Sequence, residues 1–269
     1  MKAETKKHKG INVNFSAMVI PLALVVAILI FKYIMGNPVN FQGNNSANAA
    51  LPGNYFGIVY KGGFIVPLIM TLLLTVITFV FERFFAIRKA TGKGAIPVFV
   101  GNVKAQLEEN KISEAMNECD KQKGSVANVV KSVLIKYEML EGQDKMTSEQ
   151  KVASLNKEIE DSTSLELPAL EQNLTILAVI TSLGTLMGLL GTVLGMIRAF
   201  SALANAGAPD SVALAAGISE ALVNTAFGIG TAAVAMIFYN YFTTRIDKIT
   251  YSIDEAGISI VNLFQARHA

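Results

Sequence analysis

The chain has 269 residues, of which 52% are hydrophobic and only 16% are charged, and its formal net charge is +2. This composition is typical of a membrane protein. A charge so close to balance, with no basic run interleaved with aromatic residues, gives no support for nucleic-acid binding. The single cysteine, Cys119, excludes an intrachain disulfide, and both histidines, His8 and His268, lie at the termini. We therefore expect no metal site, no cofactor and no histidine-based catalysis.

The first membrane segment follows a basic start. Residues 1–10 carry four lysines, and the uncharged run that comes next is closed by Lys32. A secretory signal peptide has the same form. The best small-residue cleavage site, residues 47–49, lies too far from the apolar run, so we expect an uncleaved transmembrane helix over residues 11–35. Residues 36–62 are rich in Asn, Gly and Pro and predict an exported loop.

A second apolar segment predicts a transmembrane helix over residues 63–85. The block from Arg88 to Glu171 then holds 26 of the chain's 44 charges, so we expect a water-exposed helical domain over residues 86–173. Apolar residues within it keep helical spacing, which indicates an amphipathic helix without chemistry of its own. They are Val126, Val129, Val130, Val133, Tyr137 and Leu140.

The third segment, residues 174–200, has no charge until Arg198 and is long enough to cross a bilayer. Small and hydroxyl residues recur along it at spacings of three and four, so they share one helical face. They are Thr181, Gly184, Thr185, Gly188, Gly191, Thr192 and Gly195. In a membrane helix such a stripe indicates that another helix lies very close along it.

The fourth segment, residues 212–242, has a matching small face. Its members are Gly217, Ala221, Thr225, Gly228 and Ala232, with Glu220 and Asn224 alongside. Glu220 is the only carboxylate inside any of the long apolar runs, and a charge at such a position is by default a functional hypothesis. Residues 201–211 predict a short exported loop, and residues 243–269 predict a C-terminal helix in water.

Basic residues define the expected orientation. They gather at the amino terminus, between Arg88 and Lys93, and in the tail, whereas the exported loops hold only Lys61. Since basic residues favour the cytoplasmic side, four crossings place both termini in the cytoplasm.

Counting residues from the inner ends of the last two spans gives the height of each polar group along its helix. Thr192 and Thr225 both come about 30 Å above the inner charges. By the same count Arg198 comes level with Glu220, nearer the outer surface. We therefore predict a contact between Arg198 and Glu220, within or between subunits.

A proton path through lipid needs titratable or hydroxyl groups on a wet face. The last two spans offer hydroxyls at Thr181, Thr185, Thr192 and Thr225, but no acid deep in the bilayer. A threonine cannot hold and release a proton near neutral pH, so the carboxylate that carries the proton must come from another polypeptide. The alternatives are threonines bonded back to their own helix and a packing or assembly role for Glu220.

Two motifs carry a resemblance to a known family. GLLGTVLGMIRAF (residues 188–200) followed by GISEALVNTAFGIGTAAVAMIFYNYF (residues 217–242) is similar to the paired signature of the MotA/TolQ/ExbB proton-channel family, closest to its ExbB and TolQ branch. Weaker similarity extends back to about Gly63. Thr185 stands where the family often has proline. The resemblance implies an all-α membrane protein whose family core of three transmembrane helices gains an extra N-terminal one, with long helices extending into the cytoplasm.

The resemblance also implies a function. Members couple inward proton flow to mechanical work in the inner membrane of a Gram-negative cell, where five copies surround single-helix partners of the ExbD or TolR type. It implies that an aspartate of the partner carries the proton, that a TonB-like transducer and membrane lipids are further partners, and that Thr192, Thr225 and Glu220 are functional positions. We predict an ExbB-like proton-channel subunit and no enzyme. The alternatives are a TolQ-like subunit, a flagellar-type stator and a non-conducting membrane scaffold.

Within this hypothesis the residues have two roles. Thr192, Thr225, Glu220, Thr181 and Thr185 are the predicted lining of the proton pathway. The residues predicted to pack the helices together are Gly184, Gly188, Gly191, Gly195, Gly217 and Gly228.

Overall fold

The computed structural model describes residues 13–143, 146–205 and 211–268. These residues form helices and turns without a strand, apart from one isolated antiparallel bridge between Phe41 and Ala50. The predicted cytoplasmic terminus (residues 1–10) and residues 206–210 of the predicted loop lie outside this part of the chain. Contacts divide the chain into two compact units. Unit 1 comprises Met1–Phe81 and Thr175–Tyr239, and unit 2 comprises Glu82–Leu174 and Asn240–Ala269.

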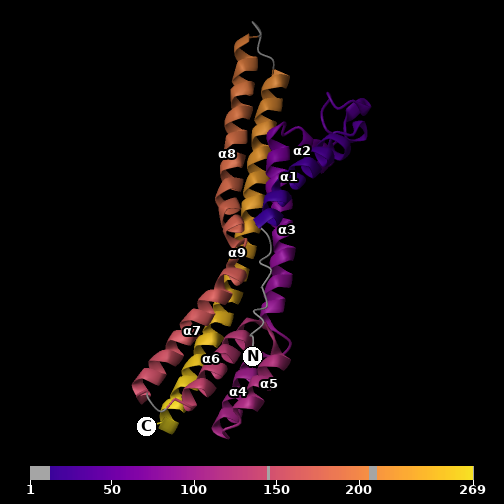
Figure 1. The fold of residues 1–269 in the computed structure, drawn as a ribbon. Coiled ribbons are helices and arrows are strands. Elements are labelled where there is room, and N and C mark those ends of the chain that lie inside the picture. The colour runs from indigo at the N-terminus through magenta and orange to yellow at the C-terminus, as the bar shows by residue number, and fades with distance from the viewer. Residues whose placement is uncertain (1–12, 144–145, 206–210, 269) are drawn as a thin grey trace. The chain divides into compact units, whose positions relative to one another are not determined.

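Each unit has its own set of elements (Figure 1). Unit 1 contains α1 (Val13–Leu29), the π-helical turn η1 (Ile30–Met35), the short helices η2 (Pro38–Asn40), η3 (Gln42–Asn44) and α2 (Tyr55–Tyr60), the first part of α3 (Ile65–Thr91), most of α8 (Leu174–Asn205) and the first part of α9 (Ser211–His268). Unit 2 contains the end of α3, the helices α4 (Ile96–Glu108), α5 (Ile112–Gln122), α6 (Gly124–Glu141) and α7 (Ser148–Glu171), and the rest of α9.

Four helical stretches are long and apolar enough to cross a membrane. They are Ala17–Met35, Ile65–Glu108, Leu174–Ala204 and Ser211–Arg267. The chain is therefore an all-α membrane protein with four candidate spans, as its sequence predicts.

Three helices continue past the ends expected from the sequence. α3 reaches Thr91 and stops before Gly92, whose φ is +83°. α8 continues five residues beyond Phe200 to Asn205, and α9 runs without a break for 58 residues through the expected boundary at residue 242. Charged residues set the edge of an apolar span, but Arg, Lys and Glu are good helix formers and do not end the helix itself.

The core of unit 1 joins α1 to α3. Ala27, Met35, Val66 and Met70 form a buried cluster, and Phe227 of α9 packs against it. Large apolar side chains elsewhere in the unit point outward, as a surface in lipid requires. Examples are Met18, Leu22, Leu186 and Leu189.

The core of unit 2 is built on α6. The six residues at helical spacing are all buried, which confirms the predicted amphipathic helix. The ring of Tyr137 meets the ring of Phe264 edge to face, with centroids 4.8 Å apart. The Arg267 guanidinium donates to Asn110 Oδ1 at 2.6 Å and to the Tyr137 hydroxyl at 3.3 Å. The last turn of α9 is thereby tied to the turn between α4 and α5.

A wholly buried arginine supports the end of α7. Arg83 Nε donates to Glu82 Oε2 at 2.6 Å, and its Nη1 donates to the Leu170 carbonyl oxygen at 3.1 Å. The last carbonyls of a helix have no partner within the helix. Arg83 therefore satisfies α7 where α7 ends, and Glu82 compensates the buried charge.

Cys119 provides an internal probe of unit 2, because it is the only cysteine. Its side chain is buried, its Sγ donates to the Ala115 carbonyl oxygen, and burial raises the pKa of the thiol to about 12. Only the thiolate reacts with maleimides, so native protein at pH 8 should be alkylated roughly a thousandfold more slowly than unfolded protein. Mass spectrometry with and without SDS measures this. Equal rates in the two conditions would show that the site is open.

Replacing Arg83 tests its support of α7. Arg83→Met leaves Glu82 unpaired and two α7 carbonyls without their donor, so unit 2 should lose about 3 kcal/mol of stability. The measurement is thermal unfolding in detergent, together with the native rate of Cys119 alkylation, which should rise. Arg88→Met, at an exposed position of the same helix, is the matched control. If the two variants behaved alike, Arg83 would have no supporting role.

Candidate functional site

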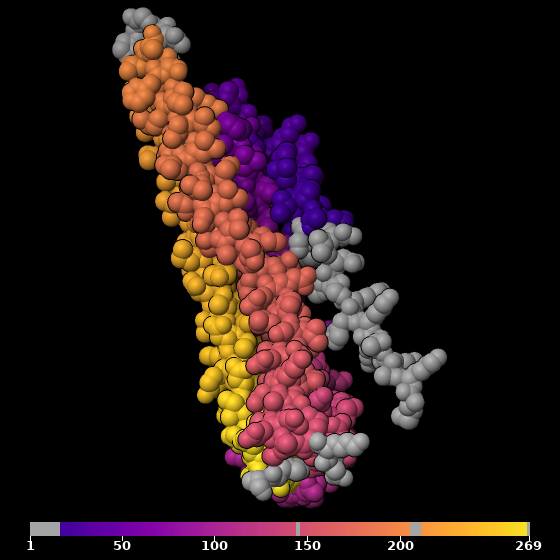
Figure 2. Space-filling view, turned by 60° about the vertical axis from the view of Figure 1, so that its left-hand side comes forward, coloured from indigo at the N-terminus to yellow at the C-terminus, as the bar shows by residue number. Residues whose placement is uncertain are grey.

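α8 and α9 meet through their small residues and lie alongside each other in both views of the molecule (Figure 1, Figure 2). A β-carbon built on Gly195 would lie 2.8 Å from the Ala221 nitrogen, and one built on Gly228 would lie 2.6 Å from the Gly184 carbonyl oxygen. The same position on other glycines has atoms of the opposite helix within 3.2 Å. These are Gly184, Gly188, Gly191 and Gly217. Along this line the two backbones approach each other directly, except at Gly191, where the Asn224 side chain lies between them.

Thr225 lies inside this interface. Its hydroxyl donates to the Ala221 carbonyl oxygen at 3.2 Å and lies 3.4 Å from the Gly188 carbonyl oxygen of α8. The next residue back, Asn224, packs on Gly191. Thr225 is therefore within one turn of the level of Thr192, which directly follows Gly191.

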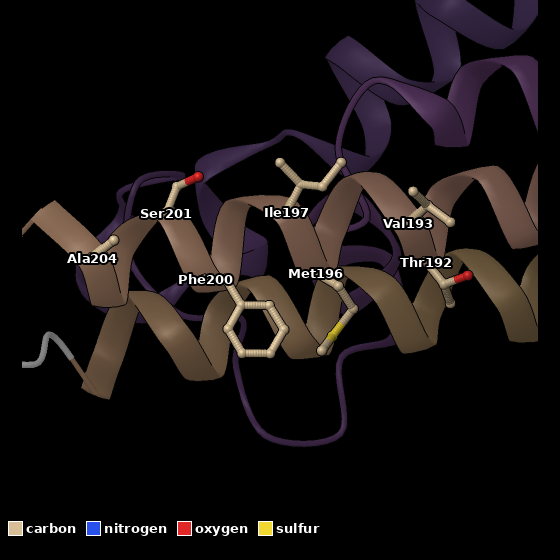
Figure 3. Close-up of a pocket in the computed structure, with 7 residues that line it drawn as sticks. All are labelled: Thr192, Val193, Met196, Ile197, Phe200, Ser201 and Ala204. Carbon is tan, nitrogen blue, oxygen red and sulfur yellow. The ribbon is translucent and has the colours of Figure 1, made fainter.

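Thr192 is placed differently from Thr225. It is half-buried, its hydroxyl donates to the Leu189 carbonyl oxygen at 2.6 Å, and it lines an open, mostly apolar groove of about 700 Å³ along α8. Figure 3 shows Thr192, Met196 and Phe200 on one side of this helix, with Val193 and Ile197 on the other. Thr192 therefore lines a groove that another helix could enter, whereas Thr225 of α9 is already in contact with α8.

The two remaining predicted hydroxyls lie lower on α8. Thr181 donates to the Ala178 carbonyl oxygen at 2.6 Å, and Thr185 donates to the Thr181 carbonyl oxygen at 3.4 Å. Thr185 is exposed and does not belong to the glycine interface, whereas Gly184 and Gly188 do. The four predicted threonines therefore all donate to backbone carbonyls. The three on α8 keep spacings of four and seven and share one side of that helix, whereas Thr225 lies on α9.

The structure brings Arg198 and Glu220 together as an ion pair between α8 and α9. The Glu220 side chain is only 13% exposed, and the Arg198 guanidinium also stands 5.6 Å from the ring centroid of Phe64. Gly63 has φ +75°, and a β-carbon there would collide with Glu220 Oε1. Only glycine allows the turn before α3 to reach this carboxylate.

Asn224 completes the cluster one helical turn after Glu220. It is fully buried, and its Nδ2 donates to the Gly62 carbonyl oxygen at 2.8 Å. The turn at Gly62 and Gly63 is thus held by two successive polar residues of α9. We call these five residues, Gly62, Gly63, Arg198, Glu220 and Asn224, the polar cluster.

Sequence analysis selected Arg198 and Glu220, and it placed Asn224 beside Glu220 without giving it a role. It missed Gly62 and Gly63, for which the available signal was a glycine pair at the start of an apolar run. Among the described residues, no group of three or more His, Cys, Asp or Glu side chains is arranged to hold a metal ion. The chemistry on offer is hydrogen bonding, close backbone packing and one ion pair.

Two glycines of α9 give a matched test of the helix interface. Gly228→Ala places a methyl against the α8 backbone and should cost about 1–3 kcal/mol of stability. Gly230→Ala meets nothing within 4 Å and should be neutral or stabilising by up to about 1 kcal/mol, since alanine favours helix. Thermal unfolding in detergent compares them. Equal midpoints would contradict the close approach of α8 and α9.

The sequence is similar to a known protein family and to several known proteins. Residues 125–255 match the MotA/TolQ/ExbB proton channel family. A putative biopolymer transport protein, an ExbB homolog of Methanothermobacter thermautotrophicus, is 28% identical over 72% of this chain and 66% of its own length. The putative biopolymer transport protein ExbB-like 3 of Synechocystis is 40% identical over 31% of this chain and 41% of its own. The Tol-Pal system protein TolQ of Pseudomonas aeruginosa is 26% identical over 72% of this chain and 85% of its own length.

The chain covers less than two thirds of the length of the first two of these relatives. The family match itself runs through α6, α7, α8 and most of α9, and it includes the glycine interface together with Thr192, Thr225, Arg198 and Glu220. Over residues 125–255, which hold both spans of the glycine interface, the chain matches the MotA/TolQ/ExbB proton channel family.

Proposed function

We propose that this chain is the channel-forming subunit of an inner-membrane complex that couples proton flow to work directed at the outer membrane. The observation that carries the proposal is the level of its hydroxyls. Thr192 and Thr225 stand within one turn of each other in two spans that pack backbone to backbone. Thr225 directly follows Asn224 of the polar cluster, on the side that faces the span interior.

The chemistry of these hydroxyls is compatible with a proton-carrying carboxyl group supplied by another polypeptide. Each threonine donates its proton to a carbonyl and keeps lone pairs that can accept. Such a group accepts a hydrogen bond from a protonated carboxyl, but it cannot donate to a carboxylate without breaking its own bond. Thr192 in this state favours the neutral form of a nearby acid, which is the form that crosses a low-dielectric region.

Glu220 is a poor candidate for the mobile carrier. Its carboxylate is already paired with Arg198 and lies against Gly63. We assign Glu220 and Arg198 to the fixed end of the pathway, where they position the turn before α3.

If the mobile acid belongs to another polypeptide, the complex needs partner subunits. A single transmembrane helix of the ExbD or TolR type would bring the carrying aspartate to the groove beside Thr192, and a TonB-like or TolA-like transducer would receive the work. We further propose a homopentamer and both termini in the cytoplasm. An ExbB-like role and a TolQ-like role are equally compatible with relatives that carry both names.

The test is a pair of near-isosteric variants. Thr192→Val and Thr225→Val remove one hydroxyl each and change side-chain volume little. A hydrogen bond to an ionisable group is worth about 1.5 kcal/mol or more, so proton flux should fall about tenfold or more in each variant. The measurement uses a pH-sensitive dye in proteoliposomes that contain the chain with an ExbD- or TolR-type subunit, under an imposed proton gradient.

Thr175→Val is the matched control, because Thr175 is an exposed threonine of the same helix at its inner end. Complex formation is followed by native mass spectrometry in parallel. Flux that stays at the control level in both variants, with the complex intact, would reject the channel and favour the scaffold.

A further inference from the structure

Residues 36–62, here called the cap, form a folded structure between two spans (Figure 1). The chain leaves η1 at Met35 and enters α3 at Ile65. The Phe41 side chain is buried, and its ring meets the Tyr60 ring edge to face at a centroid distance of 5.4 Å. The Tyr60 ring in turn stacks on Phe31 of η1 at 4.6 Å. The cap is thereby fixed to the end of the first span.

Polar bonds fix it at the same place. Asn40 Nδ2 donates to the carbonyl oxygens of Ile34 and Met35 at 2.8 and 2.9 Å. Asn54 Nδ2 donates to Asn40 Oδ1 at 3.0 Å, and the Asn54 side chain caps α2 by accepting from the Gly57 nitrogen. This network positions α2 relative to the end of η1.

The cap directs its single charge inward. Lys61 is the only charged residue between positions 33 and 81. Its Nζ donates to the carbonyl oxygens of Ser46 and Ala47 at 2.9 and 3.0 Å and stands 5.4 Å from the Phe41 ring centroid. Lys61 is half-buried and its ammonium group is bonded within the cap, so the cap offers amides, small residues and aromatic rings to its surroundings and carries no second charge.

Aromatic rings occupy that outer surface. Tyr55 is 80% exposed and Phe56 is 54% exposed, both at the start of α2. Tyr33 at the end of the first span and Phe64 at the start of α3 are also largely exposed. Water is a poor solvent for exposed aromatic rings, whereas the boundary between lipid headgroups and acyl chains concentrates Tyr and other aromatic residues.

The position of the cap along the spans agrees with that boundary. Gly63 directly follows the cap and touches the ion pair of Arg198 and Glu220, so charged groups appear at this level. From here α3 continues for 17 residues, Ile65 to Phe81, before its first charge at Glu82. That length is about 25 Å, close to the ~30 Å thickness of the hydrocarbon core.

We propose that the cap is an interfacial element that lies in the lipid headgroup region, with Tyr55 and Phe56 inserted at the edge of the acyl chains. Exposed apolar side chains of α1 are followed by exposed Tyr33 and Ile34 next to the cap, so we expect the lipid that covers α1 to reach the cap. The exposed Lys32 beside Tyr33 matches the phosphate layer at the same level. This contact is with the membrane and does not depend on proton conduction.

The experiment uses the full chain, which has no tryptophan. Tyr55→Trp and Phe56→Trp each introduce a single fluorophore at an exposed position. The variants are reconstituted in phosphatidylcholine vesicles whose acyl chains are brominated either near the headgroup or near the methyl end. Emission should shift to the blue, and intensity should fall about twofold with shallow bromine and less with deep bromine.

Two further variants calibrate the depth. Val98→Trp lies at an exposed position of α4 in the charge-rich part of the chain. Its emission should be that of tryptophan in water, and neither brominated lipid should quench it. Leu186→Trp, at an exposed position in the middle of α8, should be quenched more by deep bromine. Acrylamide quenching distinguishes water from protein contact.

Shallow quenching at either position 55 or position 56 supports the proposal. The absence of shallow quenching at both positions overturns the proposal, and the emission then distinguishes two other environments. Emission as red as that of Val98→Trp, with strong acrylamide quenching, places the cap in water. Blue emission resistant to acrylamide and to both bromolipids places the rings against another protein surface.

Discussion

The structure depends on the direct approach of two helix backbones, α8 and α9. In lipid there is little hydrophobic drive to bring apolar helices together, so association relies on close packing and on bonds between helices. Gly184, Gly188 and Gly195 provide that packing against Gly228, Ala232 and Ala221. The ion pair near one end of unit 1 depends on it, because Glu220 of α9 reaches Arg198 of α8 from a helix held this close.

The same packing determines what the pair shows to its surroundings. Small residues occupy the interface, so the large ones point outward, among them Leu186, Leu189 and Ile197. A helix whose bulk lies on its outer side offers contact area to lipid or to further helices without altering its own partner. The glycine interface thus holds the chain together and also leaves the groove beside Thr192 open.

Patterns local in sequence predicted most of this arrangement. The spacing of the glycines gave the contact face, and residue counts from the inner charges brought Arg198 level with Glu220. The bond from Asn224 to Gly62 joins positions 162 residues apart, and no periodicity within either segment marks it. The expected boundary at residue 242 reflects a change of polarity between a span and a helix in water, and the backbone of α9 continues through it as one helix.

Thr192 and Thr225 show why a shared residue type and level do not imply a shared role. The Thr225 hydroxyl lies between two acceptors, on its own helix and on α8, so its loss removes part of the contact between helices. The Thr192 hydroxyl has one short bond within its own turn, and its lone pairs face the groove. A change in assembly would therefore implicate Thr225 first, whereas a change in chemistry with assembly intact would implicate Thr192. The two effects separate because a hydroxyl that bonds back to its own helix is already satisfied in lipid and remains an acceptor for a neighbour.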